Sequence, residues 1–355
     1  MGDVTAKNLI AYCGSAEAVF NEKKSKFEKI PGIGSLTAEA ISKSDVIKDA
    51  LLRAEEEIKF IEKEGIAPLF FTDSDYPAML KQCDDAPVML YSKGKMNLNV
   101  EKIISIVGSR KSTAYGKKIC EQLVEALAPY NVLITSGLAY GIDITAHRSA
   151  IKNNLPTVGV LAHGLDLLYP AEHTNTAEKM MEKGGLLTEF MSSTKMNPEY
   201  FPRRNRIVAG MTDATIVIEA TYKSGALITA EIANSYNRDV FAVPGRMDDT
   251  SSDGCNLLIK ANKAMLIQSA EDIIKALNWD VENKKPKRIQ AELFANLSEE
   301  EEVLVNALKE KEKIHIDDLC VASRLSMSRA ASLLLNLEFS GAVKSLPGKM
   351  YALNN

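Results

Sequence analysis

The sequence between Lys102 and Ala270 alternates short apolar runs with segments of helical composition. Glycine stands at or just after the end of many of these runs. A chain with this alternation folds as a parallel sheet with helices on both faces, because each helix returns the chain to the start of the next strand. The pattern therefore predicts an α/β fold built on a doubly wound parallel sheet. The expected strands are residues 103–107, 132–135, 157–162, 186–190, 215–218 and 240–243.

Residues 1–62 are expected to form short helices. Within them, Phe27–Ile41 contains a helix end, a Pro-Gly-Ile-Gly turn and a second helix, a pattern that resembles a helix-hairpin-helix. Such a hairpin can present backbone N–H groups to a phosphate. The alternative is a glycine-tightened turn without a ligand, which Glu28 and Glu39 beside the turn favour. Two further strands, within residues 67–77 and 86–94, are expected to join the central sheet.

The last part of the chain has the pattern of a small separate domain that follows a polar, proline-containing linker. A helix that starts at Ser298, two more helices and a hairpin with a Pro-Gly turn together predict a winged helix. The helix in the recognition position, Ser326–Phe339, carries only Arg329 as a cation, which favours contact with a protein over reading of a DNA groove. The expected segments are 1–62 (helical), 63–277 (central), 278–292 (linker) and 293–355 (winged helix).

The composition excludes several classes of function. The 355 residues carry a net charge of −4, so a site for a polyanion would have to be a local feature. The five cysteines and four histidines are scattered, without a Cys-x-x-Cys pair, which indicates free thiols and no metal site. No apolar run approaches the roughly 20 residues of a membrane helix, and the N-terminus lacks the pattern of a signal peptide. These features are typical of a protein of the reducing cytoplasm.

Three glycine-containing loops each follow an expected strand and precede an expected helix: Val107–Ser112, Ser136–Asp143 and Lys223–Thr229. Unpaired N–H groups and the helix dipole make such a loop a cradle for a phosphate. Since the carboxyl ends of parallel strands meet at one edge of a sheet, we expect the three loops to lie together. Their spacing is neither Gly-x-Gly-x-x-Gly nor Walker A, so neither NAD nor ATP is expected and no cofactor is predicted.

A dense cationic cluster, Arg203–Arg206, follows Phe201 and precedes an apolar run. Arginines held in this way usually face an anion. Several phosphate-sized sites in a row suit a polymer better than a small molecule, and Phe201, with Tyr140, could stack on bases. The alternative is structural ion pairing of the arginines with Asp213 or Glu219.

Two other features are weaker candidates for chemistry. Asp143 and His147 lie four positions apart, as an acid–base pair on a helix would, but Asp143 also suits the start of that helix and His147 suits packing. Cys255 follows a glycine at a helix start, where a thiolate is stabilised, yet a buried structural cysteine is the simpler interpretation. We expect no catalytic residue among the three.

An ordered set of five motifs resembles the DNA-processing protein A (DprA/Smf) family: Ser105–Arg110, Ser136–His147, Phe201–Ile207, Ser224–Ala230, and Val243–Gly245 with Gly254–Ile259. The resemblance extends over nearly the whole chain. It implies an extended Rossmann-like central domain that binds single-stranded DNA. It also implies a homodimer without enzymatic activity, which loads the RecA recombinase onto incoming strands during natural transformation of competent cells.

The resemblance also assigns residues to the DNA site. It implies that Gly108, Ser109 and Arg110 contact a phosphate, that Phe201 stacks near a base, and that Lys195 supplies a basic residue before it. The alternative function is hydrolysis of a nucleotide N-glycosidic bond, as in related Rossmann-like folds, with Glu231 as the reacting carboxylate. The loops, the cluster and the resemblance together predict a site made of Gly108, Ser109, Arg110, Lys111, Gly137, Gly141, Lys195, Phe201, Arg203, Arg204, Asn205, Arg206, Ser224 and Gly225.

Overall fold

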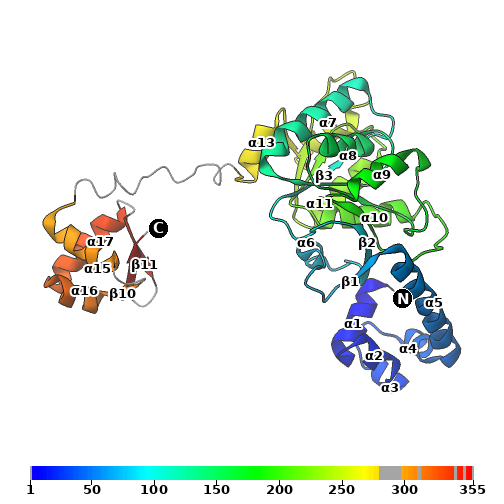
Figure 1. Cartoon of the computed structure of the whole chain (residues 1–355), viewed down its shortest axis with the longest axis horizontal. Helices are drawn as coiled ribbons and strands as arrows, with labels where there is room; N and C mark the ends of the chain where they lie inside the picture. The colour runs from blue at the N-terminus through cyan, green and yellow to red at the C-terminus, as the bar shows by residue number, and fades with distance from the viewer. Residues whose placement is uncertain (1, 280–296, 310–312, 340–341, 347–348, 354–355) are drawn as a thin grey trace. The chain divides into compact units, whose positions relative to one another are not determined.

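The computed structural model describes residues 2–279, 297–309, 313–339, 342–346 and 349–353. They belong to two compact units, Met1–Leu277 and Asn278–Asn355, which are treated separately here (Figure 1). The predicted linker, 278–292, lies outside the described residues from position 280 onward, as does the predicted turn at Pro347 and Gly348.

The larger unit is built on a nine-stranded sheet with the strand order β1-β2-β6-β5-β4-β3-β7-β8-β9. The strands from β6 to β9 pair in parallel, and β1 and β2 pair antiparallel at one edge. All six expected core strands and both expected edge strands are present, which confirms the predicted α/β fold class. The strands are β1 (Ala67–Phe70), β2 (Met89–Gly94), β3 (Ile103–Val107), β4 (Leu133–Ser136), β5 (Thr157–Val160), β6 (Gly185–Thr188), β7 (Ala214–Val217), β8 (Asp239–Ala242) and β9 (Met265–Leu266).

The strand order has a switch point between β3 and β7. From β3 the chain moves outward through β4, β5 and β6, and it then returns to β7 on the other side of β3. Because crossover connections are right-handed, this reversal places the helices of the two halves on opposite faces of the sheet. Figure 1 shows α7, α8 and α9 on one side of the strands and α10 and α11 on the other. The helices are α6 (Ala78–Lys81), α7 (Ala114–Leu127), α8 (Ile142–Lys152), α9 (Thr174–Met180), α10 (Tyr200–Gly210), α11 (Gly225–Ser235), α12 (Asp253–Lys260) and α13 (Ala270–Ala276), with short 3₁₀ helices η1 (Ala128–Tyr130) and η2 (Ala171–His173).

The N-terminal helices have a small core of their own, made by Leu9, Phe27, Ile30 and neighbouring apolar residues. The expected hairpin joins α3 to α4, and Gly32 in its turn adopts a φ of +82°, which favours glycine. Bonds from α1 and α5 tie these helices to the sheet region: Asp3 accepts a hydrogen bond from the Val88 amide at 3.1 Å. The helices are α1 (Asp3–Cys13), α2 (Ala16–Phe20), α3 (Lys24–Phe27), α4 (Ser35–Ser42) and α5 (Ser44–Glu64).

The smaller unit has the predicted winged-helix arrangement of three helices and a small antiparallel sheet in the order β10-β12-β11. Its core contains Leu304, Leu319 and Leu334. Arg329, the cation of the helix in the recognition position, binds Glu300 at 2.6 Å. The elements are α15 (Glu299–Lys309), β10 (Ile314–His315), α16 (Ile316–Ser323), α17 (Met327–Phe339), β11 (Val343–Leu346) and β12 (Met350–Leu353). Across both units, no helix of the described residues has the length and apolar character needed to span a membrane.

Candidate nucleic-acid interface

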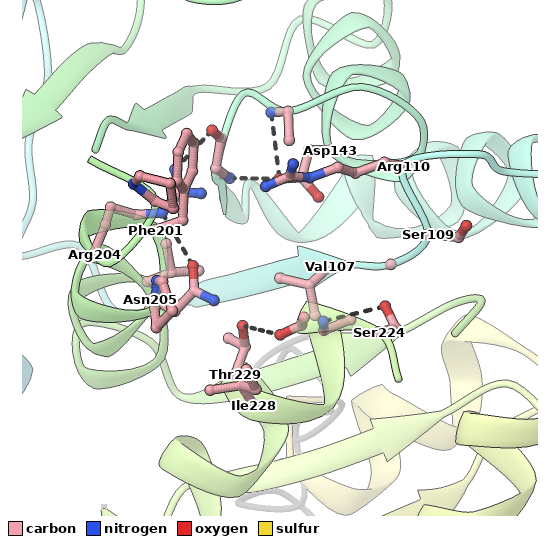
Figure 2. Close-up of a pocket in the computed structure, with 18 of the residues that line it drawn as sticks. Val107, Ser109, Arg110, Asp143, Phe201, Arg204, Asn205, Ser224, Ile228 and Thr229 are labelled. Atoms are coloured by element: carbon pink, nitrogen blue, oxygen red, sulfur yellow. Dashed lines mark hydrogen bonds between the residues drawn. The ribbon is translucent and has the colours of Figure 1, made fainter. Parts of the chain in front are cut away.

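A cavity of about 770 Å³ opens at the switch point, beyond the carboxyl ends of β3 and β7. Ligands of open α/β sheets bind in this position, because the connections from the two strands leave in opposite directions and a crevice forms between them. Figure 2 shows its walls: the loop after β3 with Ser109 and Arg110, the start of α10 with Phe201, and the start of α11 with Ile228. The three glycine loops predicted to converge do so here.

The cavity brings together most of the predicted site. The predicted residues that line it are Gly108, Ser109, Arg110, Lys111, Gly137, Phe201, Arg204, Asn205, Ser224 and Gly225. The predicted residues that do not line it are Gly141, Lys195, Arg203 and Arg206.

The arginine cluster divides because it lies within helix α10. Successive residues of an α-helix are rotated by about 100°, so neighbouring arginines face different directions, whereas residues three apart share a face. Arg203 and Arg206 both turn away from the cavity and bind the same Glu189 oxygen at 2.6 and 2.5 Å. They also bind Asp3 of α1, at 3.5 and 3.1 Å. These two arginines are neutralised by carboxylates, and the third, Arg204, is left to face the cavity.

The carboxylates expected as ion-pair partners of the cluster are used elsewhere. Asp213 accepts a hydrogen bond from the Ile103 amide at 2.7 Å, at the start of β3. Glu219 is buried and accepts hydrogen bonds from the Thr113 amide and hydroxyl, at the N-terminus of α7. The alternative of structural ion pairing therefore holds for Arg203 and Arg206, but its expected partners are wrong. Glu189 and Asp3 bind these arginines, because Asp213 and Glu219 accept hydrogen bonds from groups of their own sheet region.

Arg204 is a buried cation at the floor of the cavity, with an exposed fraction of 4%. Its Nη1 donates to the carbonyl oxygens of Gly137, at 2.7 Å, and Val160, and its Nε donates to Asn205 Oδ1 at 3.1 Å. Burial lowers the pKa of Arg204 to about 10, with Asp143 opposing the shift, so the guanidinium stays protonated at neutral pH. A Cβ on Gly137 would lie 2.4 Å from Arg204 Nη2, so the glycine is needed for the close approach of this side chain.

Asp143 lies beside Arg204 and holds the loop after β4. It is buried, and its Oδ2 accepts hydrogen bonds from the amides of Gly137, at 3.1 Å, and Ala139, at 3.4 Å. Burial raises the pKa of Asp143, while the Arg204 guanidinium and the loop amides lower it. The carboxylate therefore orders the cavity floor and balances the charge of Arg204.

The remaining candidates for chemistry are structural. His147 is buried, and its Nδ1 lies 2.7 Å from Thr157 Oγ1. Burial lowers the pKa of His147 to about 3, so the ring is neutral near pH 7. Burial also raises the pKa of the Cys255 thiol to about 12. Both side chains are fully buried, as the interpretation of His147 and Cys255 as packing residues expects.

The mouth of the cavity carries the accessible charge. The Arg110 guanidinium lies over the Phe201 ring, with Cζ 5.2 Å from the ring centroid, in a cation–π contact. Arg110 and Lys111 are both exposed, and neither forms an ion pair with a carboxylate among the residues that the structure describes. An unneutralised cation on an aromatic face suits a phosphate next to a base.

The third wall of the cavity is the start of α11. The Ser224 hydroxyl caps this helix by accepting a hydrogen bond from the Ala226 amide at 3.3 Å. A Cβ on Gly225 would meet no atom within 4 Å, so this position is open to the cavity. The described residues contain no cluster of three or more His, Cys, Asp or Glu side chains that could hold a metal ion.

Sequence reasoning missed one wall of the cavity. The segment before α10 contributes Met196, Asn197 and Pro198, and the loop before α9 contributes Tyr169. These residues carry no glycine loop and no charge, so no local pattern identified them. The proline just before a helix was the only available signal, and it marks a helix start rather than a site.

Comparisons with known proteins agree with this geometry. The family model "DNA recombination-mediator protein A" matches residues 67–278, and "DprA winged helix domain" matches residues 290–349. DNA processing protein DprA of Bacillus subtilis is 40% identical over 216 residues, which cover 61% of this chain and 72% of that protein.

Two solved structures resemble the chain. DNA processing protein A from Streptococcus pneumoniae is 30% identical with a TM-score of 0.64, covering 77% of this chain and 92% of that one. DNA processing protein A from Helicobacter pylori, described for its single-stranded DNA binding mode, is 28% identical with a TM-score of 0.55, covering 61% and 96%.

Proposed function

The chain belongs to the DNA recombination-mediator protein A family, and on this premise we propose that it binds single-stranded DNA in the cavity at the switch point. The observation that carries the proposal is the contact of the exposed Arg110 with the half-buried Phe201 at the cavity mouth, with the buried Arg204 behind it. The guanidinium of Arg110 meets a phosphate, and the ring of Phe201 offers a stacking surface to the adjoining base. Gly225, whose Cβ position is open, allows the strand to approach the backbone of its loop closely.

The floor of the cavity supports a strand without reading its sequence. Arg204 and Asp143 are committed to backbone groups, so they supply a fixed field rather than a base-specific contact. Stacking and phosphate contacts tolerate any base, because every base has a π face and every nucleotide a phosphate. The protein therefore binds single strands with little sequence preference and with marked salt dependence.

For the physiological role, we propose the one that membership of the family suggests. The protein acts in the cytoplasm as a homodimeric recombination mediator that loads the RecA recombinase onto single strands taken up in natural transformation. The winged helix contributes a protein contact rather than a second DNA site, because Arg329 is neutralised by Glu300. A strand-exchange assay tests the role: RecA-dependent exchange on strands coated with a single-strand binding protein rises when the full chain is added.

Binding to DNA is tested by fluorescence anisotropy of a labelled oligothymidylate titrated with the full chain. Arg110→Ala lowers the affinity by at least about tenfold at low salt, since it removes a charged phosphate contact and half of the cation–π pair. Arg246→Ala is the matched control, because Arg246 is exposed on a loop, does not line the cavity and pairs with Asp248, two positions on. An equal affinity of wild type and Arg110→Ala would remove the proposed site.

The alternative hydrolase activity has less support. Glu231, its reacting carboxylate, does not line the cavity; its side chain is 61% exposed and binds Lys263 at 3.1 Å. The carboxylate that does line the cavity, Asp143, is held by two loop amides. Incubation with nucleoside monophosphates, followed by chromatography, should yield no free base. Release of base that is lost in Glu231→Gln would establish the enzyme instead.

A further inference from the structure

A second hollow, of about 780 Å³, adjoins the cavity on the side of α7 and α8. Arg110 and Lys111 line both, so the two depressions meet at the cationic mouth described above. A third hollow, of about 370 Å³, continues from the second toward α9, and Arg148 and Glu172 line both of these. The three depressions therefore adjoin one another in a row that starts at the cavity.

Cations line this row beyond the cavity. Lys117 lies on α7, Arg148 and Lys152 lie four residues apart on one face of α8, and Lys179 lies on α9. All four side chains are exposed, and within the described residues none forms an ion pair with a carboxylate. We call Lys117, Arg148, Lys152 and Lys179 the basic track.

Two carboxylates also line these hollows, against the four cations of the basic track. They are Glu121 and Glu172. Glu172 Oε2 accepts a hydrogen bond from the Tyr140 hydroxyl at 2.9 Å, which holds the exposed Tyr140 ring at the edge of the second hollow. This ring also packs edge-on against His173, with centroids 5.1 Å apart. An exposed, braced aromatic ring between cations is a stacking surface for a base.

The cations of the basic track have no ion pairs among the described residues, in contrast to Arg203 and Arg206. Both of those arginines bind Glu189 and Asp3, so their charge is spent within the protein. Lys and Arg side chains that are exposed, unpaired and arranged along a groove are the arrangement that follows a nucleic-acid backbone.

We propose that the single strand continues from the cavity across Arg110 and Lys111 and along the basic track, whose cations contact successive phosphates. The inference rests on the proposed function, and it sets the length of strand that one protomer holds. In this proposal, the cavity holds one part of the strand. The basic track adds salt-sensitive affinity only for strands long enough to reach it.

The test compares two oligothymidylates, of about 4 and about 16 nucleotides, which bracket the site sizes of common single-strand binding folds. The variant is Arg148→Gln/Lys152→Gln/Lys179→Gln in the full chain. The matched control is Lys48→Gln/Lys59→Gln/Lys63→Gln, which removes three exposed cations from α5 and changes the net charge equally. Affinities are measured by anisotropy between 50 and about 300 mM salt, in the range where phosphate contacts dominate.

The expected result is that the track variant binds the short strand like wild type and binds the long strand about tenfold more weakly at low salt. Its slope of log K against log salt for the long strand falls by about 0.7 per lost phosphate contact. The control changes neither value. An unchanged ratio of long-strand to short-strand affinity in the track variant would overturn the track and leave the cavity site intact. Failure of wild type to bind either strand would instead overturn the proposed function, and the track with it.

Discussion

Gly137 gives the sharpest test of how the cavity floor is held together. Gly137→Ala would place a methyl group 2.4 Å from Arg204 Nη2 and 2.6 Å from its Cζ. A guanidinium on a flexible side chain could ordinarily move aside, but Arg204 is buried and bonded to two backbone carbonyls. Overpacking costs about 1–3 kcal/mol, and a hydrogen bond to a charged group is worth about 1.5–3 kcal/mol. We therefore expect the free energy of unfolding to fall by about 3 kcal/mol.

The measurement is thermal and urea unfolding of the full chain, followed by circular dichroism for the transition of the larger unit. Gly225→Ala is the matched control: its Cβ meets no atom within 4 Å, so its stability should stay within about 0.5 kcal/mol of wild type. A double-mutant cycle identifies the mechanism. The loss in Gly137→Ala/Arg204→Met should be smaller than the sum of the single losses, because the methyl group then meets no guanidinium.

Two results would refute this reasoning. If Gly137→Ala were as stable as Gly225→Ala, the guanidinium of Arg204 could leave its buried position at little cost. If the double-mutant losses simply added, the strain at Gly137 would not involve Arg204 at all.

Three further predictions concern separate parts of the larger unit. Glu57→Ala should lower the free energy of unfolding by roughly 3 kcal/mol, because the buried carboxylate binds the Ser192 amide and hydroxyl at 3.0 and 2.6 Å. It should also weaken DNA binding, because the segment that carries Met196 loosens. An unaltered affinity in the anisotropy assay would contradict the effect on binding. Burial lowers the pKa of His147 to about 3 in the folded protein, so the unfolded state takes up a proton as the pH drops below about 6.5 and the folded state does not. This should destabilise the fold by roughly 2 kcal/mol at pH 5. The thermal midpoint of His147→Gln should therefore fall less between pH 7 and pH 5 than that of wild type, and an equal fall in both would assign the loss to other groups. Gly225→Leu should fill part of the cavity and lower oligothymidylate affinity at near-wild-type stability, and unchanged binding would show that the strand passes elsewhere.

The sheet could be predicted closely because its pattern is local. A buried parallel strand needs apolar side chains on both faces, so Ile103–Val107 is recognisable without knowledge of its neighbours. The glycine loops were recognisable for a related reason: their position after a strand and before a helix is a sequence property, and a parallel sheet brings such loops to one edge. The cavity could be located at that edge from the sequence, although its far wall at Met196 could not.

Which of the arginines face the cavity and which form ion pairs was decided by the tertiary structure. As a cluster in the sequence, Arg203–Arg206 predicted one anion site. In helix α10, however, Arg204 points toward the cavity floor, whereas Arg203 and Arg206 bind Glu189 and Asp3. Asp3 lies about 200 positions away in the chain, and no spacing rule connects such partners, because ion pairs depend on which surfaces meet after folding. The sequence by itself therefore determined the sheet, its loops and the kinds of charge available, since these depend on local periodicity. The three-dimensional packing alone decided which charged side chains form ion pairs within the protein and which remain available to bind a strand.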